Sequence, residues 1–489
     1  MFRGLLTMAV LLAVAGNCPP IGFSSLSAAE PTRDEAVSAM QRACQFFREH
    51  CSAGGGYVFR LSSDLRLREG ELAVGSTTAW IEPPATPAVG HAYLDAYRLT
   101  GEASLLEAAR ETAQALLQGQ LLSGGWTEQI EFAPQDRQRY AYRVEGDQVG
   151  ERRNTTTFDD DKTQSALRFL MSLDHELEQA DARLHEAVVY GLAAVLEAQY
   201  SNGAWPQRYQ GQPAAEVATL SATYPASWSR TFPSESYSDY FTLNDGTLSD
   251  LIETMLLAGD IYDDPAYTAA AFNAGEFLLR AQMPDPQPGW AQQYDPQMHP
   301  AWARKFEPPA ISGGESQAVM RTLVRLYQRT GDRRYADAVQ RGLAYFRTCL
   351  LPDGRLARFY ELQSNRPLYF TTNYELTYRD DDLPTHYSFK VTSQLDRISR
   401  ELQRALDDPP RPPADAVKQF SAEAPKPKLT AQLEQAAAEA IASLDERGAW
   451  VEPGRLRTYP QADVREIISS STFIKNVNTL AQFIAAQVP

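Results

Sequence analysis

One unit recurs along this sequence of 489 residues: two stretches with the apolar spacing of amphipathic helices, followed by a turn that contains glycine. Residues 92–101 begin one copy, and residues 323–332 begin another. The turns that end the copies are Ser123-Gly124-Gly125-Trp126, Gly203-Ala204-Trp205, Gly289-Trp290, Pro352-Asp353-Gly354 and Gly448-Ala449-Trp450. Their uneven spacing favours helix pairs joined by loops of variable length over a strict solenoid.

Each helix pair can bury one face on its neighbours, so several pairs in succession can close into a ring. We therefore predict an all-α protein with the architecture of an α/α toroid, a barrel of helical hairpins with long polar and aromatic loops. An open helical-repeat scaffold that binds other proteins is the alternative. It fits less well, because scaffold repeats keep a tighter period and carry fewer long aromatic loops.

Several of these loops place an aromatic side chain next to Arg or Gln, as residues 205–209, 290–294 and 358–362 do. A flat ring suits the C–H face of a sugar, while the neighbouring polar group can hydrogen-bond the sugar hydroxyls. We therefore expect Trp205 to contact a carbohydrate.

The chain divides into four predicted segments. Residues 1–29 resemble a secretory signal peptide with cleavage after Ala29, residues 30–400 form the toroid, the Pro-rich residues 401–429 form a linker, and residues 430–489 form a helix pair that packs on the toroid. This reading predicts a secreted or periplasmic protein, with no membrane association after cleavage. The net charge of −16 argues against a nucleic-acid ligand, which requires a basic face.

Three cysteines, Cys44, Cys51 and Cys349, remain after the predicted cleavage. An odd number leaves at least one thiol free or in an intermolecular bond. A bridge between Cys44 and Cys51 would require the helix between them to end.

Three adjacent aspartates, Asp159, Asp160 and Asp161, stand directly before an apolar helix pattern, and Asp245 stands before another. One aspartate suffices to cap a helix, so three exceed that need. If two such helix ends meet at one end of the ring, their carboxylates converge into a group that suits Ca²⁺, a cation that takes many oxygen ligands.

Five motifs in this order resemble the pectate lyases of polysaccharide lyase family ten. They are Gly124-Gly125-Trp126, Thr157-Phe158-Asp159-Asp160-Asp161, Phe241-Thr242-Leu243-Asn244-Asp245, Trp302-Ala303-Arg304-Lys305-Phe306-Glu307-Pro308-Pro309 with Ser312-Gly313-Gly314-Glu315-Ser316, and Arg358-Phe359-Tyr360-Glu361. The resemblance covers residues 54–366 and implies an α/α toroid, in agreement with the repeats.

The resemblance also implies a reaction: Ca²⁺-assisted β-elimination on polygalacturonate, an acidic polysaccharide, by a monomer. It implies that Asp159 and Asp161 hold the metal and that Arg304 takes the C5 proton of the sugar. Because guanidinium is ordinarily protonated, an arginine base needs a cationic environment, for which Ca²⁺, Lys305 and Arg366 are the candidates.

The remaining site residues are expected to bind substrate: Asp245, Lys305, Arg358, Arg366, Arg379 and Trp205. The sequence departs from the family at Asp160, where Asn is usual, and at Lys162. It also lacks a further arginine near residues 371–373, for which Arg379 is the candidate replacement.

Two other functions are compatible with these patterns. An inverting glycoside hydrolase on the same toroid would need two carboxylates that flank the sugar bond, and Glu128, Glu307 and Asp245 are the candidates. A carbohydrate-binding or scaffold protein without catalytic activity is the second alternative.

Overall fold

The computed structural model describes residues 31–212, 214–408 and 427–487. The predicted signal peptide, residues 1–29, lies outside the described residues, and so do residues 409–426 of the predicted linker. The start of that linker is helical, because the helix α11 continues to Asp407.

Helices form two concentric layers. The inner layer consists of α2 (Thr86–Thr100), α5 (Lys162–Glu176), α7 (Thr247–Tyr262), α9 (Glu315–Thr330), α11 (Leu395–Asp407) and α14 (Ser470–Ala486). The outer layer consists of α1 (Arg33–Phe46), α3 (Ala103–Gly119), α6 (Ala182–Glu197), α8 (Pro265–Ala281), α10 (Arg333–Thr348) and α13 (Ala431–Ala442). The shorter helical elements are η1 (Phe47–Cys51), α4 (Pro134–Arg137), η2 (Arg143–Glu145), η3 (Asp159–Asp161) and η4 (Asn244–Gly246).

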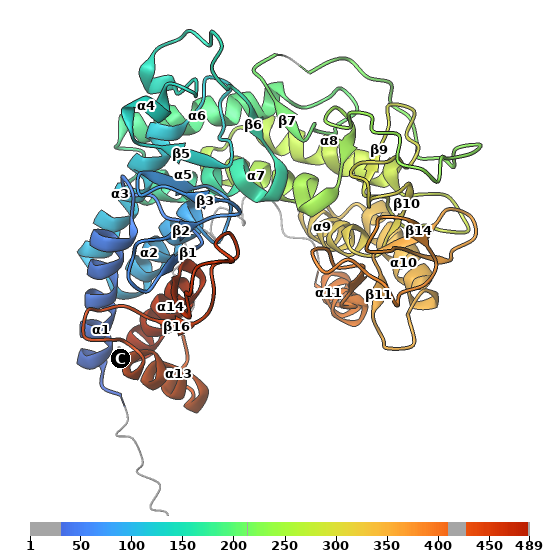
Figure 1. Ribbon diagram of the computed structural model, residues 1–489. Helices are drawn as coiled ribbons and strands as arrows, with labels where there is room; N and C mark the ends of the chain where they lie inside the picture. Colours follow the sequence, from blue (N-terminus) through green and yellow to red (C-terminus); the bar gives the residue numbers. More distant parts are fainter. Residues whose placement is uncertain (1–30, 213, 409–426, 488–489) are drawn as a thin grey trace, which may run out of the picture.

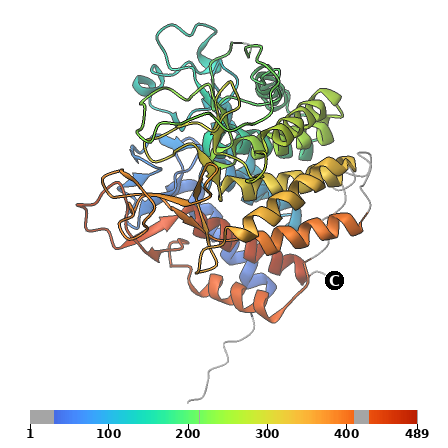
Figure 2. The same cartoon turned by 90° about the vertical axis from the view of Figure 1, so that its right-hand side faces the viewer.

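The helix pairs follow one another around an arc. The inner helices contact each other in the order α14, α2, α5, α7, α9, α11, and each of α3, α6, α8 and α10 packs on the inner helix that precedes it in the chain. Figure 1 shows this arc, open between α11 and α14. The side view in Figure 2 shows strands and loops gathered at one end of the helices. The predicted α/α toroid is confirmed.

The strands are short, and all of the named pairs are antiparallel. A five-stranded sheet has the order β16 (Glu452–Pro453), β17 (Glu466–Ser469), β1 (Arg60–Ser62), β2 (Arg68–Glu69), β3 (Ala73–Val74). A four-stranded sheet has the order β10 (Ala310–Ser312), β12 (Phe359–Glu361), β13 (Pro367–Phe370), β14 (Leu376–Thr377). The two-stranded sheets pair β4 (Thr78–Trp80) with β5 (Gln129–Glu131), β6 (Thr156–Thr157) with β7 (Arg208–Tyr209), β8 (Phe241–Thr242) with β9 (Gln293–Tyr294), and β11 (Leu356–Ala357) with β15 (Lys390–Val391).

These strands repeat with the helices. The strand before each of α2, α5 and α7 pairs with the first strand after the next outer helix, and the strand before α9 pairs with the second strand after α10, which gives the pairs β4·β5, β6·β7, β8·β9 and β10·β12. The residues just before each inner helix are thereby held at the same end of the arc. That end carries the candidate site.

One hydrogen bond recurs in the repeats and joins each turn to the end of its outer helix. In four repeats the indole Nε1 of the turn tryptophan donates to a carbonyl near the end of that helix: Trp126 to Leu116 at 2.9 Å, Trp205 to Val195 at 2.8 Å, Trp290 to Leu278 at 2.8 Å and Trp450 to Ala440 at 2.8 Å. Since helix ends leave carbonyls without intrahelical partners, each tryptophan satisfies one of them.

Glutamines connect neighbouring outer helices in the same way. The side-chain amide of a glutamine after the outer helix donates both to the turn and to the next outer helix: Gln120 to Gly124 and Ala187, Gln199 to Gly203 and Ala270, Gln282 to Pro288 and Ala338. These bonds are between 2.8 and 3.0 Å long. They fix the spacing of the outer layer.

Two of the turn glycines cannot be replaced without displacing backbone or packing. Gly124 has φ +97° and Gly203 has φ +91°, and a Cβ would lie 2.2 Å from the Cβ of Ala194 and 2.2 Å from the carbonyl oxygen of Asn273, respectively. A positive φ and contacts this close are tolerated only by glycine.

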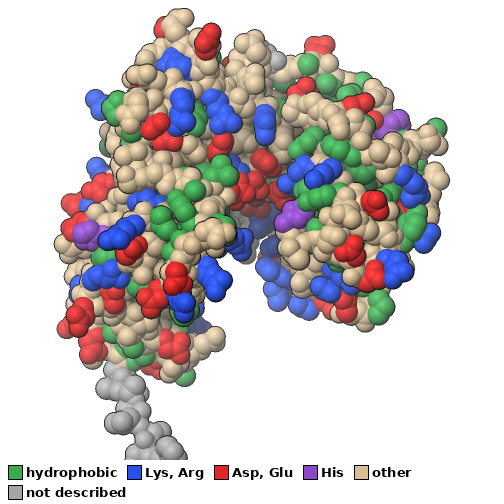
Figure 3. Space-filling model, viewed as in Figure 1, with side chains coloured by type: hydrophobic (Ala, Val, Ile, Leu, Met, Phe, Trp, Pro, Cys, Tyr) green, Lys and Arg blue, Asp and Glu red, His purple; other side chains and the backbone are tan. Residues whose placement is uncertain are grey.

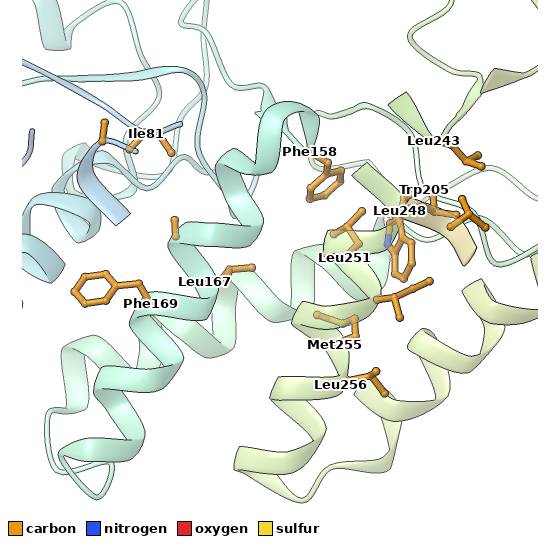
Figure 4. Packing of buried hydrophobic residues seen from close by; sticks show 14 of the residues in the cluster. Ile81, Phe158, Leu167, Phe169, Trp205, Leu243, Leu248, Leu251, Met255 and Leu256 are labelled. Atoms are coloured by element: carbon orange, nitrogen blue, oxygen red, sulfur yellow. The ribbon is translucent and has the colours of Figure 1, made fainter. Parts of the chain in front are cut away.

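The hydrophobic core lies between the two layers. Figure 4 shows Leu248, Leu251 and Met255 of α7 beside the ring of Trp205, with Phe158 nearby. Cys44, Cys51 and Cys349, the three cysteines in the described part of the chain, are free and buried, and burial raises the pKa of Cys44 and of Cys51 to about 12. None of the helices in the described part of the chain combines the length and apolar character that a membrane crossing needs.

Candidate active site

The candidate site lies where the inner helices α5 and α7 begin. The turns η3 and η4 precede these helices and contact each other. Three of their aspartates have left-handed backbone angles: φ is 51° at Asp160, 57° at Asp161 and 47° at Asp245. Such conformations are uncommon outside glycine, although aspartate tolerates them best, and they gather at functional sites.

Carboxylates from the two turns converge. One oxygen from each of Asp159, Asp160 and Asp245 lies within 4.8 Å of the others. We call these three residues the carboxylate cluster. Figure 3 shows Asp and Glu side chains gathered at the head of the notch between the two arms of the arc, with Lys and Arg side chains along its sides.

The carboxylate cluster carries negative charge that its surroundings do not fully balance. Desolvation and the charge of Asp160 raise the pKa of Asp245 to about 7, although its side chain is 36% exposed. Burial and the same neighbour raise the pKa of Asp159. Oδ1 of Asp159 and Oδ1 of Asn244 are buried and accept no hydrogen bond within the described part of the chain.

A divalent cation would satisfy both of these features. Hard carboxylate and amide oxygens are the ligands that Ca²⁺ prefers, and a cation lowers the pKa of carboxyl groups beside it. The residues present therefore fit Ca²⁺.

Asp161, expected to hold the metal together with Asp159, points elsewhere. Both of its carboxylate oxygens accept from Nη2 of Arg168, at 2.7 and 2.6 Å. The left-handed backbone at Asp160 and Asp161 turns consecutive side chains in different directions, so Asp160 joins Asp159 instead.

Lys162 supplies a cation on the outer side of the cluster. Its ammonium lies 2.8 Å from Oδ2 of Asp160 and 3.2 Å from Oε2 of Glu82, and its side chain is only 6% exposed. One of the two departures from the family pattern, Lys162, therefore balances the other, Asp160.

Arg304 reaches the cluster from the loop before β10. Its Nη2 lies 4.0 Å from Oδ2 of Asp245, and its Nε donates to Oε2 of Glu307 at 2.8 Å. Desolvation alone would lower the pKa of Arg304, but the hydrogen bond and the charge of Glu307 outweigh it and raise this pKa. In the free protein Arg304 is therefore a cation within an acidic environment.

A network of side chains supports the Arg304–Glu307 pair. The hydroxyl of Tyr387 donates to Oε1 of Glu307 at 3.1 Å, and the guanidinium of Arg358 lies 4.7 Å from the centre of the Tyr387 ring. Arg358 in turn donates from Nη1 to Oε1 of Glu315 at 3.1 Å, at the start of α9. The side chain of Arg358 is 16% exposed, so it borders the site and also holds its wall.

The other expected substrate-binding cations lie further out. Lys305 is exposed, with its Nζ 3.5 Å from the centre of the Tyr374 ring, and Arg366 is exposed with its guanidinium 3.4 Å from the centre of the Tyr378 ring. Arg379 is 79% exposed and pairs with Asp381, two residues away. The guanidinium of Arg379 therefore lies at the surface, and its role as replacement for the missing family arginine stays a prediction.

Trp205 is fully buried, with 0% of its surface exposed, so it cannot serve as a sugar platform. Its ring packs in the core, and its indole N–H donates a hydrogen bond to the carbonyl of Val195. The expectation of a substrate contact is therefore corrected: Trp205 is one of the four structural tryptophans of the turns.

Three residues near the site were not among the expected site residues. Asp160 was part of the acidic triplet, and the spacing alone could not distinguish it from Asp161. Tyr387 carries no motif signal. Tyr237 comes from the long segment between β7 and β8, and its pKa is raised by burial and then by the charge of Glu307.

Residues 120–326 match the family model described as pectic acid lyase. A family 10 polysaccharide lyase from Cellvibrio cellulosa is 20% identical, with a TM-score of 0.45 over 65% of this chain and 95% of that chain. A mutant of that lyase in complex with trigalacturonic acid is 19% identical, with a TM-score of 0.45 over 65% of this chain and 98% of that chain.

A D-mannose isomerase is similar over 94% of this chain and 100% of its own, at 13% identity and a TM-score of 0.46. No curated protein matches the sequence. The segment matched by the family model contains the carboxylate cluster and Arg304. Residues 120–326 match the pectic acid lyase family model, so the resemblance drawn from the motifs is confirmed over this segment of the chain.

Proposed function

We propose that this protein is a pectate lyase that cleaves polygalacturonate by β-elimination, with Ca²⁺ bound at the carboxylate cluster. The observation that carries the proposal is the position of Arg304, whose Nη2 lies 4.0 Å from Asp245 of the cluster. A candidate base and a candidate cation site are thus neighbours, as the reaction requires. The family match over residues 120–326 supports the same reaction class.

The C5 proton of a galacturonate unit is only weakly acidic. Bound Ca²⁺ would neutralise the uronate carboxylate and so make this proton easier to remove. Arg304 accepts the proton on a guanidine nitrogen, and the C5–H electron pair becomes the C4=C5 double bond. The C4–O bond breaks at the same time, and the departing oxygen takes a proton from water. The products are a shortened chain and a 4,5-unsaturated uronide.

The charge of Arg304 sets the conditions for this step. Glu307 raises the pKa of Arg304, so only a small fraction is neutral near pH 7. We expect proton abstraction to accelerate as the pH rises, because the neutral fraction grows tenfold per pH unit below the pKa. Glu307 also fixes the direction of the guanidine nitrogens toward the cluster.

The acidic polymer is bound by cations that line the notch. Arg358 borders the site, and Lys305 and Arg366 extend this positive surface. A local basic surface on an acidic protein can attract a polyanion over short distances. Action on an extracellular polymer, by a monomer that is secreted or periplasmic, is part of the proposal.

The hydrolase alternative has less support from the carboxylates. Glu307 is occupied by Arg304, and Glu128 accepts from Nη1 of Arg153 at 2.7 Å. Burial raises the pKa of Glu128, but the hydrogen bond from Thr127 and the charge of Arg153 outweigh it, and the net pKa is lowered. A general acid needs a raised pKa, which among the three candidates only Asp245 has.

The deciding experiment is an assay of the purified protein on polygalacturonate with Ca²⁺, followed by the ultraviolet absorbance of the conjugated 4,5-unsaturated product. A rise in absorbance that stops on addition of EDTA supports the lyase. New reducing ends without this absorbance would instead indicate hydrolysis, and an unchanged polymer would indicate a binding protein.

A further inference from the structure

A second hollow lies beside the carboxylate cluster and outside the segment that matches the family model. It is a cavity of about 380 Å³ between the five-stranded sheet, the loop before α2 and the beginning of α14. Its wall includes Phe59, Arg60, Glu71, Glu82, Arg457 and Ser471. We call it the terminal pocket, since residues from both ends of the described chain form it.

The terminal pocket and the carboxylate cluster share a wall. Oxygens of Glu71, Glu82 and Asp160 lie within 4.8 Å of one another, and Lys162 joins Glu82 to Asp160. A line of contacts therefore runs from Arg304 through Asp245 and Asp160 to Glu82. The reacting centre lies at one end of this line, and the terminal pocket lies at the other.

The side chains of the pocket suit a sugar acid. Arg457 is exposed and has no ion-pair partner within residues 31–212, 214–408 and 427–487. Arg60 donates to Glu69 at 3.1 Å and keeps 29% of its side chain exposed. Guanidinium groups bind carboxylates in two-pronged geometry, and an exposed arginine with no partner is free to do so.

The same wall offers groups for the rest of a sugar ring. Phe59 is half-buried, with its ring edge-on to Trp80 at 6.1 Å, and Ser471 is exposed. The carboxylates of Glu71 and Glu82 can accept hydrogen bonds from hydroxyls. A volume of this size is typical of sites for small ligands.

We propose that the terminal pocket binds a further uronate unit of the same acidic polysaccharide, with Arg457 as the partner of its carboxylate. This inference rests on the proposed function, since it takes the polymer to pass the carboxylate cluster. It adds a binding site built by residues 59–84 and 457–471, outside residues 120–326.

The test compares Arg457→Ala with Arg455→Ala. Both arginines are exposed and lie two positions apart, but Arg455 does not line the pocket. Dissociation constants are measured by calorimetry for galacturonate oligomers from two to eight units, and steady-state kinetics are measured with the same oligomers. We expect Arg457→Ala to weaken binding of the long oligomers about tenfold, with kcat unchanged, because one charge-assisted contact is lost. The shortest oligomers and the Arg455→Ala variant should behave as the wild type does.

The outcomes separate this proposal from the proposed function. If Arg457→Ala binds long oligomers as tightly as the wild type does, the terminal pocket is not a subsite, whether or not the lyase reaction is seen. If binding depends on Arg457 and on oligomer length while no unsaturated product forms, the terminal pocket is a subsite and the proposed lyase function is wrong. If the wild type binds no oligomer of any length, both proposals are wrong.

Discussion

Arg304 and Glu307 form a two-pronged ion pair in which Nε and Nη2 of the arginine donate to Oε2 and Oε1 of the glutamate. The glutamate side chain is 1% exposed, whereas 41% of the arginine side chain faces solvent. The pair therefore orients an accessible guanidinium from a buried anchor. The negative charge of Glu307 also keeps this guanidinium protonated, and Arg304 has to lose that proton before it can act as a base.

Replacing Glu307 should change how the rate depends on pH. The variant Glu307→Gln keeps a hydrogen-bond acceptor but removes the negative charge, so the pKa of Arg304 falls. If Arg304 is the base, the rise of kcat/KM with pH moves to lower pH in this variant. A pH profile with an unshifted rise would show that another group takes the proton.

Removing the guanidinium should abolish most of the reaction. We expect Arg304→Ala to lower kcat by roughly 10²–10⁴-fold, the range that general acid–base catalysis supplies. Arg333→Ala, on the outer helix α10, is the matched control and should retain the wild-type rate. Activity is measured as initial rates of product absorbance with saturating polygalacturonate and Ca²⁺. Loss of activity in both variants would point to misfolding and not to a base.

The carboxylate cluster and Asp161 should respond differently to substitution. Asp159→Asn and Asp245→Asn should weaken Ca²⁺ binding measured by calorimetry, because each removes a negative ligand. Asp161→Asn should leave the Ca²⁺ affinity nearly unchanged but lower the stability by about 1–2 kcal/mol, since Arg168 loses a charged acceptor. Equal losses of Ca²⁺ affinity at Asp159 and Asp161 would contradict the arrangement described here.

Trp205 should matter for stability and not for substrate. Trp205→Phe removes the hydrogen bond to Val195 and part of the ring volume, so we expect a loss of at least about 1 kcal/mol in the free energy of unfolding. KM and kcat of the folded variant should stay at the wild-type values. A raised KM with an unchanged melting temperature would instead show that Trp205 contacts the sugar.

His91 should make the protein sensitive to mild acid. Burial, aided by the charges of Arg168 and Arg98, lowers its pKa from 6.5 to about 3. Below pH 6.5 His91 binds a proton in the unfolded chain but not in the folded chain, so the free energy of unfolding falls as the pH decreases from 6.5 toward 3. At pH 5 this amounts to about 2 kcal/mol.

The check is denaturant unfolding of the wild type and of His91→Gln at pH 7 and pH 5. The loss of stability between the two pH values should be smaller in the variant. An equal loss in both proteins would show that other groups cause the acid sensitivity.

The helical architecture was accessible from the sequence because it depends on local patterns. Apolar spacing gave the helices, and glycines such as Gly203 marked turns that need a left-handed backbone. The prediction that Trp205 contacts a carbohydrate was wrong, since an aromatic residue in a polar loop can contact either a ligand or the core. Its recurrence at equivalent positions in four turns is the signal for a structural role, because one ligand would not need a platform in every repeat.

The details of the site depend on features that no spacing reveals. Whether Asp160 or Asp161 joins Asp159 is decided by two left-handed residues and by Arg168, which lies seven positions after Asp161, about two helical turns further on. Arg379 was expected to reach the substrate, but a nearer acid, Asp381, holds it at the surface. Tyr387 reaches Glu307 across eighty positions of sequence, a contact that only the folded chain defines.

The pairing of β1 with β17 places Arg60 opposite Ser469. About 400 residues separate β1 from β17, so a ribosome must release all of them before β1 can pair with this partner. Until then the five-stranded sheet lacks β17, which joins β16 to β1, and α2 lacks α14, which packs against it. Contacts of such long range are slow to form and leave surfaces exposed in the meantime. The wall beside the acidic centre therefore stays incomplete until β17 and α14 have been synthesised.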